Sequence, residues 1–475
     1  MEVITLMLLA GSLLGLRSGL FLLVLVGKRR MESTLRRLVR NGPFLEYFTL
    51  IKKIGIRDFM EAGFRAISGK MLERPFGTNR RLFYMDRIQF NPVCFTRPPL
   101  PASTPIKTEV VLGPKAQKPL TIRMPIMVGG WAYGGAVSLK TELALARNSM
   151  LTGTPVNTGS GPFLPEVRAV ADKYILQYSR GYWAKSEEVL RQADMIEIAL
   201  GQGGWGAAPK RIPGYKVTAE FAQRISAIPG LDVLVEARLP EVEDFTDWRR
   251  LIERLKTVTG GVPIAVKIGG THHLEKELDV LIDGGADVIV IDGKEGGTHG
   301  GPGIILDDMG LPTLLCLCRA DNHLQKRGVR GQVSLIIGGG LVSPGDFLKC
   351  LALGADAVIV GTIAALTMSN VQVTKTIPWE PPTEILFYNG RKVKEYDVEQ
   401  GAKTLSNYFH SCLEEMIVLT RALGKKDLQE VNREDLVALD RLYADFTGVK
   451  YMEAKSTANW SAATGSDFGE SGVGG

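Results

Sequence analysis

A glycine-rich loop follows a short apolar run near the middle of the chain. Residues 286–302 read A-D-V-I-V-I-D-G-K-E-G-G-T-H-G-G-P. The β-branched run is typical of a buried parallel strand, and the glycines after it let a ligand approach the backbone because no Cβ stands in the way. The pattern therefore predicts the rim of a cofactor site. Within it, Glu295 is a candidate substrate contact, and His299 is either a proton donor or substrate contact, or a loop histidine that faces solvent.

Two further glycine clusters follow apolar runs later in the chain, at residues 338–340 and at Gly361-Thr362. Backbone N–H groups and a short helix N-terminus at such positions commonly bind a phosphate. Tight strand-to-helix turns also select glycine. The two clusters together favour a ligand that carries a phosphate group.

Lys267 lies inside the apolar run P-I-A-V-K-I. A buried ammonium needs an anionic partner, because burying it unpaired is costly. The residue is either one half of a structural ion pair or a charge beside a cofactor or oxyanion. In flavoenzymes a cation near the ring stabilises its reduced, anionic form, and Lys267 is the first candidate for that role.

Eight short apolar segments alternate with helical patterns from residue 125 onward, and nearly every segment ends in glycine or a polar residue. This pattern predicts a (β/α)8 TIM barrel, which brings all these ends to one mouth. A doubly wound open sheet is the alternative. The predicted strands are Pro125–Val128, Thr154–Asn157, Tyr174–Tyr178, Met195–Ala199, Pro263–Ile268, Asp287–Ile291, Val333–Ile337 and Ala357–Val360, with an extra apolar run at 232–236 interpreted as an excursion.

The amino-terminal segment predicts a membrane anchor. Residues 3–26 form an apolar run of about bilayer-spanning length, with Arg17 as its only charged residue. Basic residues follow the run, and the positive-inside rule then leaves the catalytic domain in the cytoplasm. We therefore expect a single-pass membrane protein. A helix packed on the body of the protein or on a partner is the alternative.

Composition limits the possible partners. The net charge is +6 over 475 residues, but the segment 28–40 alone holds six basic residues against one acidic residue. The remainder is close to neutral, which argues against nucleic-acid binding. The five cysteines show no C-x-x-C spacing, and the adjacent pair His272-His273 seldom shares one ion, so we predict reduced thiols and no metal site.

Several motifs in one order resemble the FMN-binding domain of the glutamate synthase family, over about residues 85–450. They are P-I-M-V-G-G-W-A-Y-G-G (125–135), N-T-G (157–159), I-D-G-K-E-G-G-T-H-G-G-P (291–302), G-L-P-T (310–313), G-G-G-L-V-S-P-G-D (338–346) and N-R-E-D-L-V-A-L-D (432–440). The resemblance implies FMN as cofactor, with catalytic roles for Lys267, Gln177 and Glu295. It also implies a phosphate site at Gly339, Gly340, Gly361 and Thr362, and a ring site near Gly129, Gly130, Asn157, Gln177 and Lys267.

The sequence also departs from the family pattern. Leu176, Tyr182 and Ser160 stand where the family usually has lysine, arginine and glutamate, and the stretch 196–205 reads I-E-I-A-L-G-Q-G-G-W. Lost cations remove charge-assisted hydrogen bonds from a site meant for a dicarboxylate. Residues 367–382 contain none of the family's iron-sulfur cysteines, and the family's amidotransferase domain is not recognisable. We therefore expect a membrane-anchored variant that takes ammonia and electrons from elsewhere.

The prediction is an FMN-dependent oxidoreductase of the glutamate synthase type, acting on a carbon–nitrogen bond of an amino acid, imine or 2-oxo acid with an unidentified electron donor. The alternative is a non-catalytic flavin- or phosphate-ligand-binding scaffold at the membrane. The expected segments are a transmembrane anchor (1–27), a basic amphipathic helical lead-in (28–84), an extended proline-rich arm (85–124), the FMN-binding barrel (125–380), a C-terminal helical extension (381–460) and a disordered tail (461–475).

Overall fold

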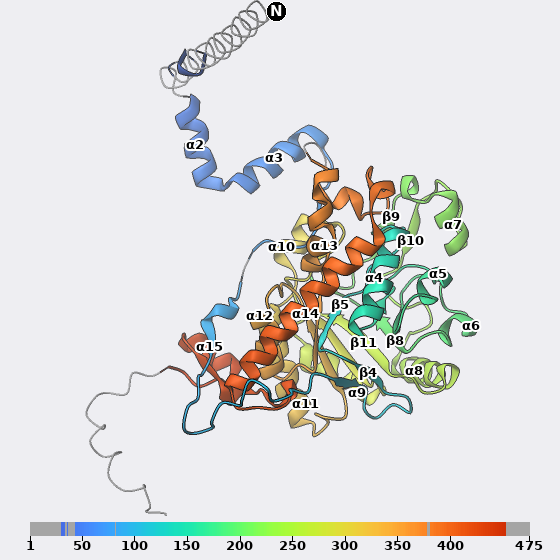
Figure 1. The fold of residues 1–475 in the computed structure, drawn as a ribbon. Helices are drawn as coiled ribbons and strands as arrows, with labels where there is room; N and C mark the ends of the chain where they lie inside the picture. Colours follow the sequence, from blue (N-terminus) through green and yellow to red (C-terminus); the bar gives the residue numbers. More distant parts are fainter. Residues whose placement is uncertain (1–29, 34–35, 37–42, 81, 378–380, 453–475) are drawn as a thin grey trace, which may run out of the picture. The chain divides into compact units, whose positions relative to one another are not determined.

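The computed structural model describes residues 30–33, 36, 43–80, 82–377 and 381–452 (Figure 1). The chain divides into two units, residues 1–72 and residues 73–475. The first unit contains α2 (Pro43–Ile54) and α3 (Ile56–Ser68). Helix α3 ends at Gly69, which adopts φ 61° and donates its N–H to the carbonyl of Arg65. Glycine reaches this left-handed conformation without the steric cost of a Cβ.

The predicted membrane location requires correction. Within the described ranges, no helix combines the length and the apolar character needed to cross a bilayer. This finding contradicts the prediction of a single-pass membrane protein with a cytoplasmic catalytic domain. The predicted span itself, residues 1–27, lies outside the described residues, as does the predicted disordered tail, 461–475.

The second unit is built on a barrel of eight parallel strands. They are β5 (Ile126–Val128), β6 (Val156–Asn157), β7 (Tyr174–Tyr178), β8 (Met195–Ala199), β11 (Ile264–Gly269), β12 (Val288–Asp292), β14 (Ser334–Gly338) and β15 (Ala357–Val360). Each predicted strand corresponds to one of these. The strands pair in chain order, and the last, β15, pairs in parallel with the first, β5.

This closure excludes the doubly wound alternative, in which the strand order reverses at a switch point. The remaining join, between β5 and β6, carries no ladder pairing in the described residues. Just beyond these strands, however, the N–H of Trp131 donates to the carbonyl of Asn157 at 3.4 Å. The predicted (β/α)8 barrel is thus confirmed as a nearly closed one.

Helices and smaller elements surround the barrel. The helices are α4 (Leu139–Thr152), α5 (Pro165–Arg168), α6 (Glu187–Leu190), α7 (Ala219–Ile225), α8 (Phe245–Thr259), α9 (Leu274–Asp283), α10 (Gly303–Asp308), α11 (Thr313–Lys326), α12 (Pro344–Ala352), α13 (Thr362–Ser369), α14 (Val398–Ala422) and α15 (Arg441–Thr447). The 3-10 helices are η1 (Met85–Arg87), η2 (Gly214–Lys216), η3 (Asn370–Lys375), η4 (Pro382–Ile385), η5 (Val393–Glu395), η6 (Leu428–Glu430) and η7 (Arg433–Asp435).

Four antiparallel strand pairs lie outside the barrel. They are β1 (Glu73–Arg74) with β13 (Gly301–Pro302), β2 (Ile88–Phe90) with β16 (Leu436–Ala438), β3 (Val110–Leu112) with β4 (Leu120–Ile122), and β9 (Lys210–Ile212) with β10 (Val233–Val235). The last pair confirms that the apolar run 232–236 is an excursion from the barrel. It follows β8 and returns the chain to β11 by way of α8.

The hairpin of β3 and β4 closes the amino end of the barrel. Its inward residues, Leu112 and Ile122 among them, are fully buried in one apolar cluster with side chains from the barrel interior, such as Met195 and Val288. The N–H of Gly113 donates to Ser334 Oγ, at the start of β14. Figure 1 places β4 at the opposite end of the barrel from α7 and α10, so the carboxyl ends of the strands remain open.

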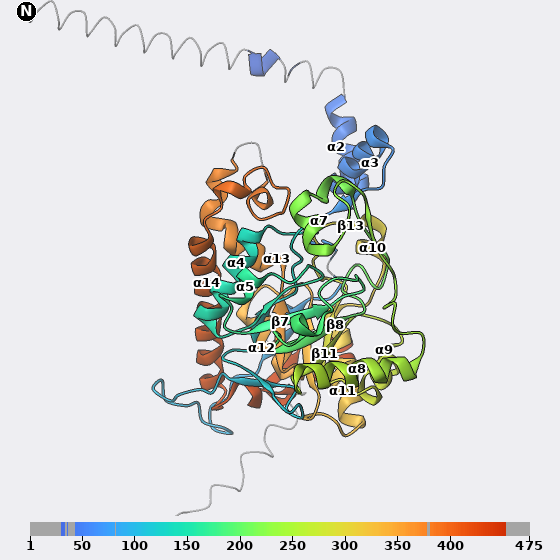
Figure 2. The same ribbon diagram turned by 90° about the vertical axis from the view of Figure 1, so that its right-hand side faces the viewer.

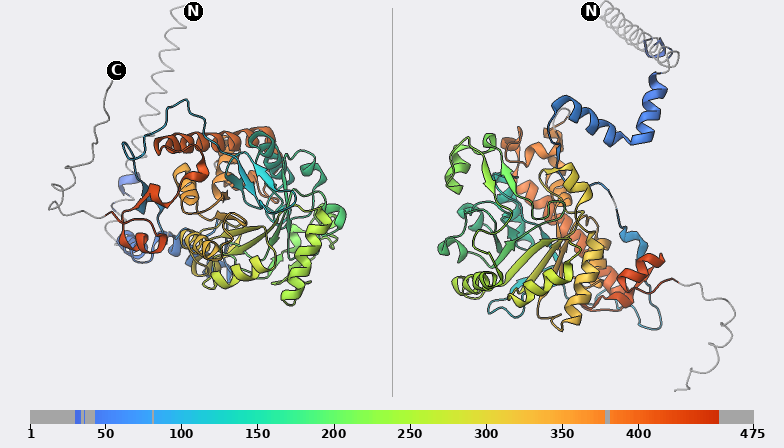
Figure 3. Two further views of the ribbon diagram at one scale, coloured as in Figure 1. Left: turned by 90° about the horizontal axis from the view of Figure 1, so that it is seen from below. Right: turned by 180° about the vertical axis from the view of Figure 1, so that it is seen from behind.

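Helix α14 packs along α4 on the outside of the barrel. It runs along one edge of the unit in Figure 2, and the view from below in Figure 3 shows the same arrangement. It lies within residues 381–460, for which the sequence predicts a helical extension. It begins at the N-cap Asp397, whose side chain accepts a hydrogen bond from the N–H of Gln400. Such a cap satisfies a backbone donor that the first turn leaves free.

Candidate functional site

A cavity opens where the barrel strands end. Its empty volume is about 1140 Å³, including the part open to solvent. Most residues predicted for the cofactor site line this cavity: Gly129, Gly130, Gln177, Lys267, Gly339, Gly340, Gly361 and Thr362. Five separate strand ends supply them. The carboxyl ends of barrel strands are where barrel enzymes bind their ligands.

The glycines after β14 and β15 form a backbone cradle. Gly339 and Gly340 adopt φ 117° and 70°, a region that favours glycine. Gly361 is the N-cap of α13, and a Cβ added to it would meet no atom within 4 Å. The first N–H groups of α13 have no partner within the helix. An open cradle beside free N–H groups fits a phosphate.

Lys267 is buried and paired in the floor of the cavity. Its Nζ lies 3.3 Å from Asp292 Oδ2, and the two side chains are 5% and 10% exposed. Burial lowers the pKa of Lys267, but the carboxylates of Asp292 and Glu197 outweigh that effect and hold the pKa above its usual value. The lysine is therefore charged at neutral pH. Both interpretations of the sequence apply, since the residue forms an ion pair and also lines the cavity.

Glu197 orients two of the predicted site residues. Its Oε1 accepts hydrogen bonds from Gln177 Nε2 at 2.7 Å and from Asn157 Nδ2 at 3.1 Å. Gln177 and Glu197 are opposite each other in the pairing of β7 with β8, which sets this contact. A carboxylate only accepts hydrogen bonds, so the amide nitrogen of Gln177 must face it. The carbonyl oxygen of Gln177 is then left for a ligand.

Two predicted site residues do not line the cavity. Asn157 lies directly behind Gly130, where an added Cβ would come within 2.7 Å of Asn157 Oδ1. Glu295 faces α11, because its Oε2 accepts from both the N–H and the hydroxyl of Thr313 at 2.8 Å. This contact fastens the glycine-rich loop to the N-terminus of α11. It gives Glu295 a positioning role, and the geometry does not support contact with a substrate.

His299 lies in the wall of the cavity rather than in solvent. Its Nε2 lies 3.1 Å from Lys216 Nζ, and its ring stacks edge-on with Phe387 at 4.4 Å. Burial, followed by the charges of Lys216 and Lys210, lowers the pKa of His299 to about 3. The imidazole is therefore neutral. An ammonium only donates, so Nε2 is the acceptor and Nδ1 carries the proton.

Residues 73–80 form a wall of the cavity that the sequence did not indicate. Strand β1 pairs with β13, the N–H of Phe76 donates to the carbonyl of Thr298 at 2.8 Å, and the ring of Phe76 lines the cavity. Phe76 has φ 67°, which is costly for a residue with a Cβ. Beside it, Gly77 packs so closely that a Cβ would approach the carbonyl oxygen of Gly296 to 2.5 Å.

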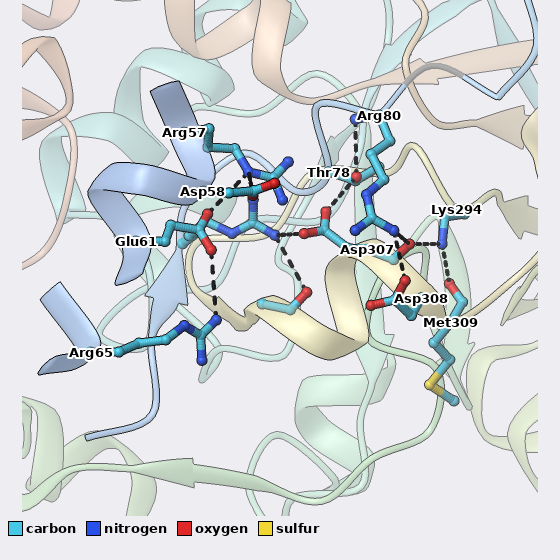
Figure 4. A network of polar contacts seen from close by, with 12 residues as sticks. Arg57, Asp58, Glu61, Arg65, Thr78, Arg80, Lys294, Asp307, Asp308 and Met309 are labelled. Atoms are coloured by element: carbon cyan, nitrogen blue, oxygen red, sulfur yellow. Dashed lines mark hydrogen bonds and ion pairs between the residues drawn. The ribbon is translucent and has the colours of Figure 1, made fainter. Parts of the chain in front are cut away.

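Polar contacts fasten this segment to α10 (Figure 4). Thr78 Oγ1 donates to Asp307 Oδ1 at 2.7 Å, and Arg80 Nη1 donates to Asp308 Oδ1 at 2.6 Å. Lys294, from the glycine-rich loop, donates to the carbonyl oxygen of Asp307 at 2.6 Å. The segment, the loop and α10 are thereby held as one wall. Residues 73–80 show no helical or strand periodicity in the sequence. The feature that could have indicated their contact with the loop is Gly296, whose backbone packs against Gly77.

A (β/α)8 barrel with a phosphate cradle and a buried cation at its mouth defines a class of cofactor-dependent barrel proteins. The conserved region in glutamate synthase matches residues 89–426. The chain belongs to this family.

Individual relatives agree with this assignment. A glutamate synthase large subunit-like protein of Rhizobium meliloti is 31% identical over 385 residues, 77% of this chain and 87% of that protein. An archaeal-type glutamate synthase [NADPH] of Thermotoga sp. is 29% identical, covering 87% and 86%. Among solved structures, a mandelate oxidase variant with an FMN adduct matches with a TM-score of 0.45 and 17% identity, covering 74% and 87%. The predicted membership of the glutamate synthase family is confirmed by the family match and by these two relatives.

Proposed function

We propose that this chain is an FMN-dependent oxidoreductase of the glutamate synthase type, which acts on the carbon–nitrogen bond of 2-iminoglutarate, glutamate or a related amino acid. One observation carries the proposal: a single cavity joins a glycine cradle on β14 and β15 to a buried, charged lysine on β11. The membership of the chain in the glutamate synthase family supports it. The electron donor is then a reduced nicotinamide, as the name of the Thermotoga relative states for that protein.

Different residues of the cavity would bind the phosphate and the ring of FMN. The backbone N–H groups at Gly339, Gly340 and the start of α13 would hold the FMN phosphate. Lys267 would place its positive charge at the ring, where charge develops on reduction, and Gln177 would present its carbonyl oxygen as an acceptor. When bound, FMN supplies the hydride transfer that no side chain can perform.

The other residues of the site position these groups and restrict water. Asp292 and Glu197 keep Lys267 protonated through their charges, and Asp292 also forms an ion pair with it. Phe76 and Phe387 put apolar surface on the cavity wall. Apolar walls strengthen the electrostatic interactions inside a site, because they keep its effective dielectric constant low.

Purified protein tests the proposal in two stages. The full chain is loaded with FMN, its flavin is reduced by light under anaerobic conditions, and 2-oxoglutarate plus ammonium is then added. We expect the flavin absorbance to return and glutamate to form in equal amount, with neither additive sufficient alone. Failure to bind FMN contradicts the proposal. A protein that binds FMN but is not reoxidised by any 2-oxo acid with ammonium is instead the non-catalytic binding module.

A further inference from the structure

One lysine in the cavity wall has no anionic partner. Lys210, on β9, lines the cavity and is only partly exposed. Among the residues that the structure describes, no carboxylate forms an ion pair with it and no side chain accepts a hydrogen bond from it. Lys267, the other lysine in the lining, is neutralised by Asp292. A desolvated ammonium without a counterion is costly, so Lys210 is suited to a ligand that supplies the negative charge.

The neighbours of Lys210 strengthen this positive region. The positive charges of Lys216 and Arg180 help to lower the pKa of Lys210, and neutral His299 lies beside Lys216. Arg180 donates its hydrogen bonds to backbone carbonyls, including Ala207 and Ala237, and these carry no full charge. Among the described residues, Glu73 is the one acidic group whose charge acts on this cluster, and it is exposed and interacts with Lys216. Positive charge therefore exceeds negative charge at this end of the cavity.

The position of Lys210 separates it from the phosphate cradle. Around the barrel the strands follow the order β5, β6, β7, β8, β11, β12, β14, β15, so β8 and β15 lie on opposite sides. Lys210 belongs to the excursion after β8, whereas Gly361 follows β15. The predicted ring site includes Gln177 on β7 and Lys267 on β11, the two strands that flank β8. A cofactor held by its phosphate at β15, with its ring at β7 and β11, would leave Lys210 beside the ring, where a second molecule would bind.

We propose that Lys210 forms an anion subsite that holds the carboxylate of the substrate, a 2-oxo, 2-imino or amino acid. This inference rests on the proposed function, since it takes the ring site as occupied by FMN. It also accounts for a departure from the family. The family's cations are absent at positions 176 and 182, and the lysine expected at 197 is replaced by glutamate, so a carboxylate must find its counterion elsewhere, and Lys210 supplies it.

The ionisation of Lys210 gives the subsite a pH dependence. Burial, together with the charges of Lys216 and Arg180, lowers the pKa of Lys210 to about 8. Below that pH the ammonium attracts a carboxylate, and above it the neutral amine does not. Burial also lowers the pKa of Lys216, Glu73 opposes that effect, and His299 stays neutral throughout this range. Carboxylate affinity should therefore fall as the pH rises from 7 to 9.5.

The test uses the FMN-loaded full chain and measures the dissociation constant of 2-oxoglutarate by the change in flavin absorbance. We expect Lys210→Met to raise the constant at least tenfold at pH 7, and Lys210→Arg to stay within about threefold, because a charged hydrogen bond contributes roughly a factor of ten or more. Between pH 7 and 9.5 the wild type should weaken by about tenfold per pH unit above the pKa. Lys210→Arg should stay flat. The control is Lys326→Met, at the exposed end of α11, which should match the wild type.

Three outcomes overturn the inference. One is a Lys210→Met protein that binds 2-oxoglutarate as the wild type does. Another is a wild type whose affinity does not change with pH. The third is a Lys210→Met protein that loses FMN rather than 2-oxoglutarate, which would place Lys210 in the cofactor site. If the wild type takes up no FMN, the proposed function fails, and calorimetric titration of the same variants with 2-oxoglutarate still decides the role of Lys210.

Discussion

Lys267 shows how one residue serves stability and cofactor binding together. It is the counterion of Asp292, while Glu197 beside it holds Gln177 in place. Replacing it by methionine leaves two buried carboxylates without a cation. Removing one partner of a buried pair usually costs about 3–5 kcal/mol, because the remaining charge stays desolvated.

We therefore expect Lys267→Met to lower the free energy of unfolding by about that amount and to weaken FMN binding tenfold or more. Urea denaturation and fluorescence titration with FMN measure the two effects. Lys267→Arg keeps the charge and should recover part of both. The matched control is Lys392→Met, which breaks an exposed pair with Glu395 at 2.8 Å and should cost less than about 1 kcal/mol. Equal losses in Lys267→Met and Lys392→Met would contradict the assigned role.

Gly77 tests the contact between residues 73–80 and the glycine-rich loop. It has φ 81°, and a Cβ would clash with the carbonyl oxygen of Gly296. Gly230 offers a matched control, because it has φ 80° with no atom within 4 Å of an added Cβ. Both alanine variants carry the cost of the left-handed backbone, about 1–2 kcal/mol. Only Gly77→Ala should also displace the loop.

The expected result is a fall in FMN affinity for Gly77→Ala at an FMN concentration that still saturates Gly230→Ala. Thermal unfolding should report a similar backbone cost in both variants. If Gly230→Ala lost FMN equally, positive φ alone would explain the effect and the close packing on Gly296 would not matter.

At the scale of elements, α4 carries a buried glutamate that has an oxygen without a hydrogen-bond partner among the described residues. Glu142 lies in its first turn, is 1% exposed, and its Oε1 has no hydrogen-bond partner among the described residues. Burial raises the pKa of Glu142 well above its ordinary value of 4.5. The unfolded chain releases this proton near pH 4.5, whereas the folded chain keeps it to a higher pH. Between the two pKa values the folded state binds more protons, so stability falls as the pH rises.

Glu142→Gln removes this titration while preserving the shape of the side chain. We expect the variant to exceed the wild type in stability by about 1–3 kcal/mol at pH 8, since a buried group without partners costs about that much. At pH 5 the difference should shrink, because the wild-type carboxyl is then protonated. Urea midpoints at the two pH values measure it. A constant difference between pH 5 and pH 8 would show that Glu142 does not titrate there.

For the molecule as a whole, the regular part of the fold could be predicted from the sequence and the irregular part could not. Each barrel strand is an apolar run that ends in glycine or a polar residue, and this signal is local. The pairing of β1 with β13 joins two-residue strands 228 positions apart, measured from Glu73 to Gly301, which no local pattern encodes. Lys210 lies on an excursion whose position depends on the folded barrel. The apolar amino-terminal run predicted a membrane location that the structure contradicts.

The two ends of the barrel should separate stability from function. The carboxyl end carries the cavity, and the amino end is closed by the β3–β4 hairpin, where Leu112 is fully buried and its neighbour Val111 is 47% exposed. Leu112→Ala should lower the free energy of unfolding by about 2–5 kcal/mol, because it leaves a cavity in the barrel core. Val111→Ala on the same strand should change it by no more than about 0.5 kcal/mol.

Neither change should alter the FMN dissociation constant of the protein that remains folded, because neither Val111 nor Leu112 lines the cavity. Urea denaturation followed by FMN titration below the transition separates the two quantities. A fall in FMN affinity for Leu112→Ala without urea would mean that packing at the amino end sets the geometry of the mouth. The barrel would then act as one mechanical unit, and the residues of its core would have to be counted among the determinants of cofactor binding.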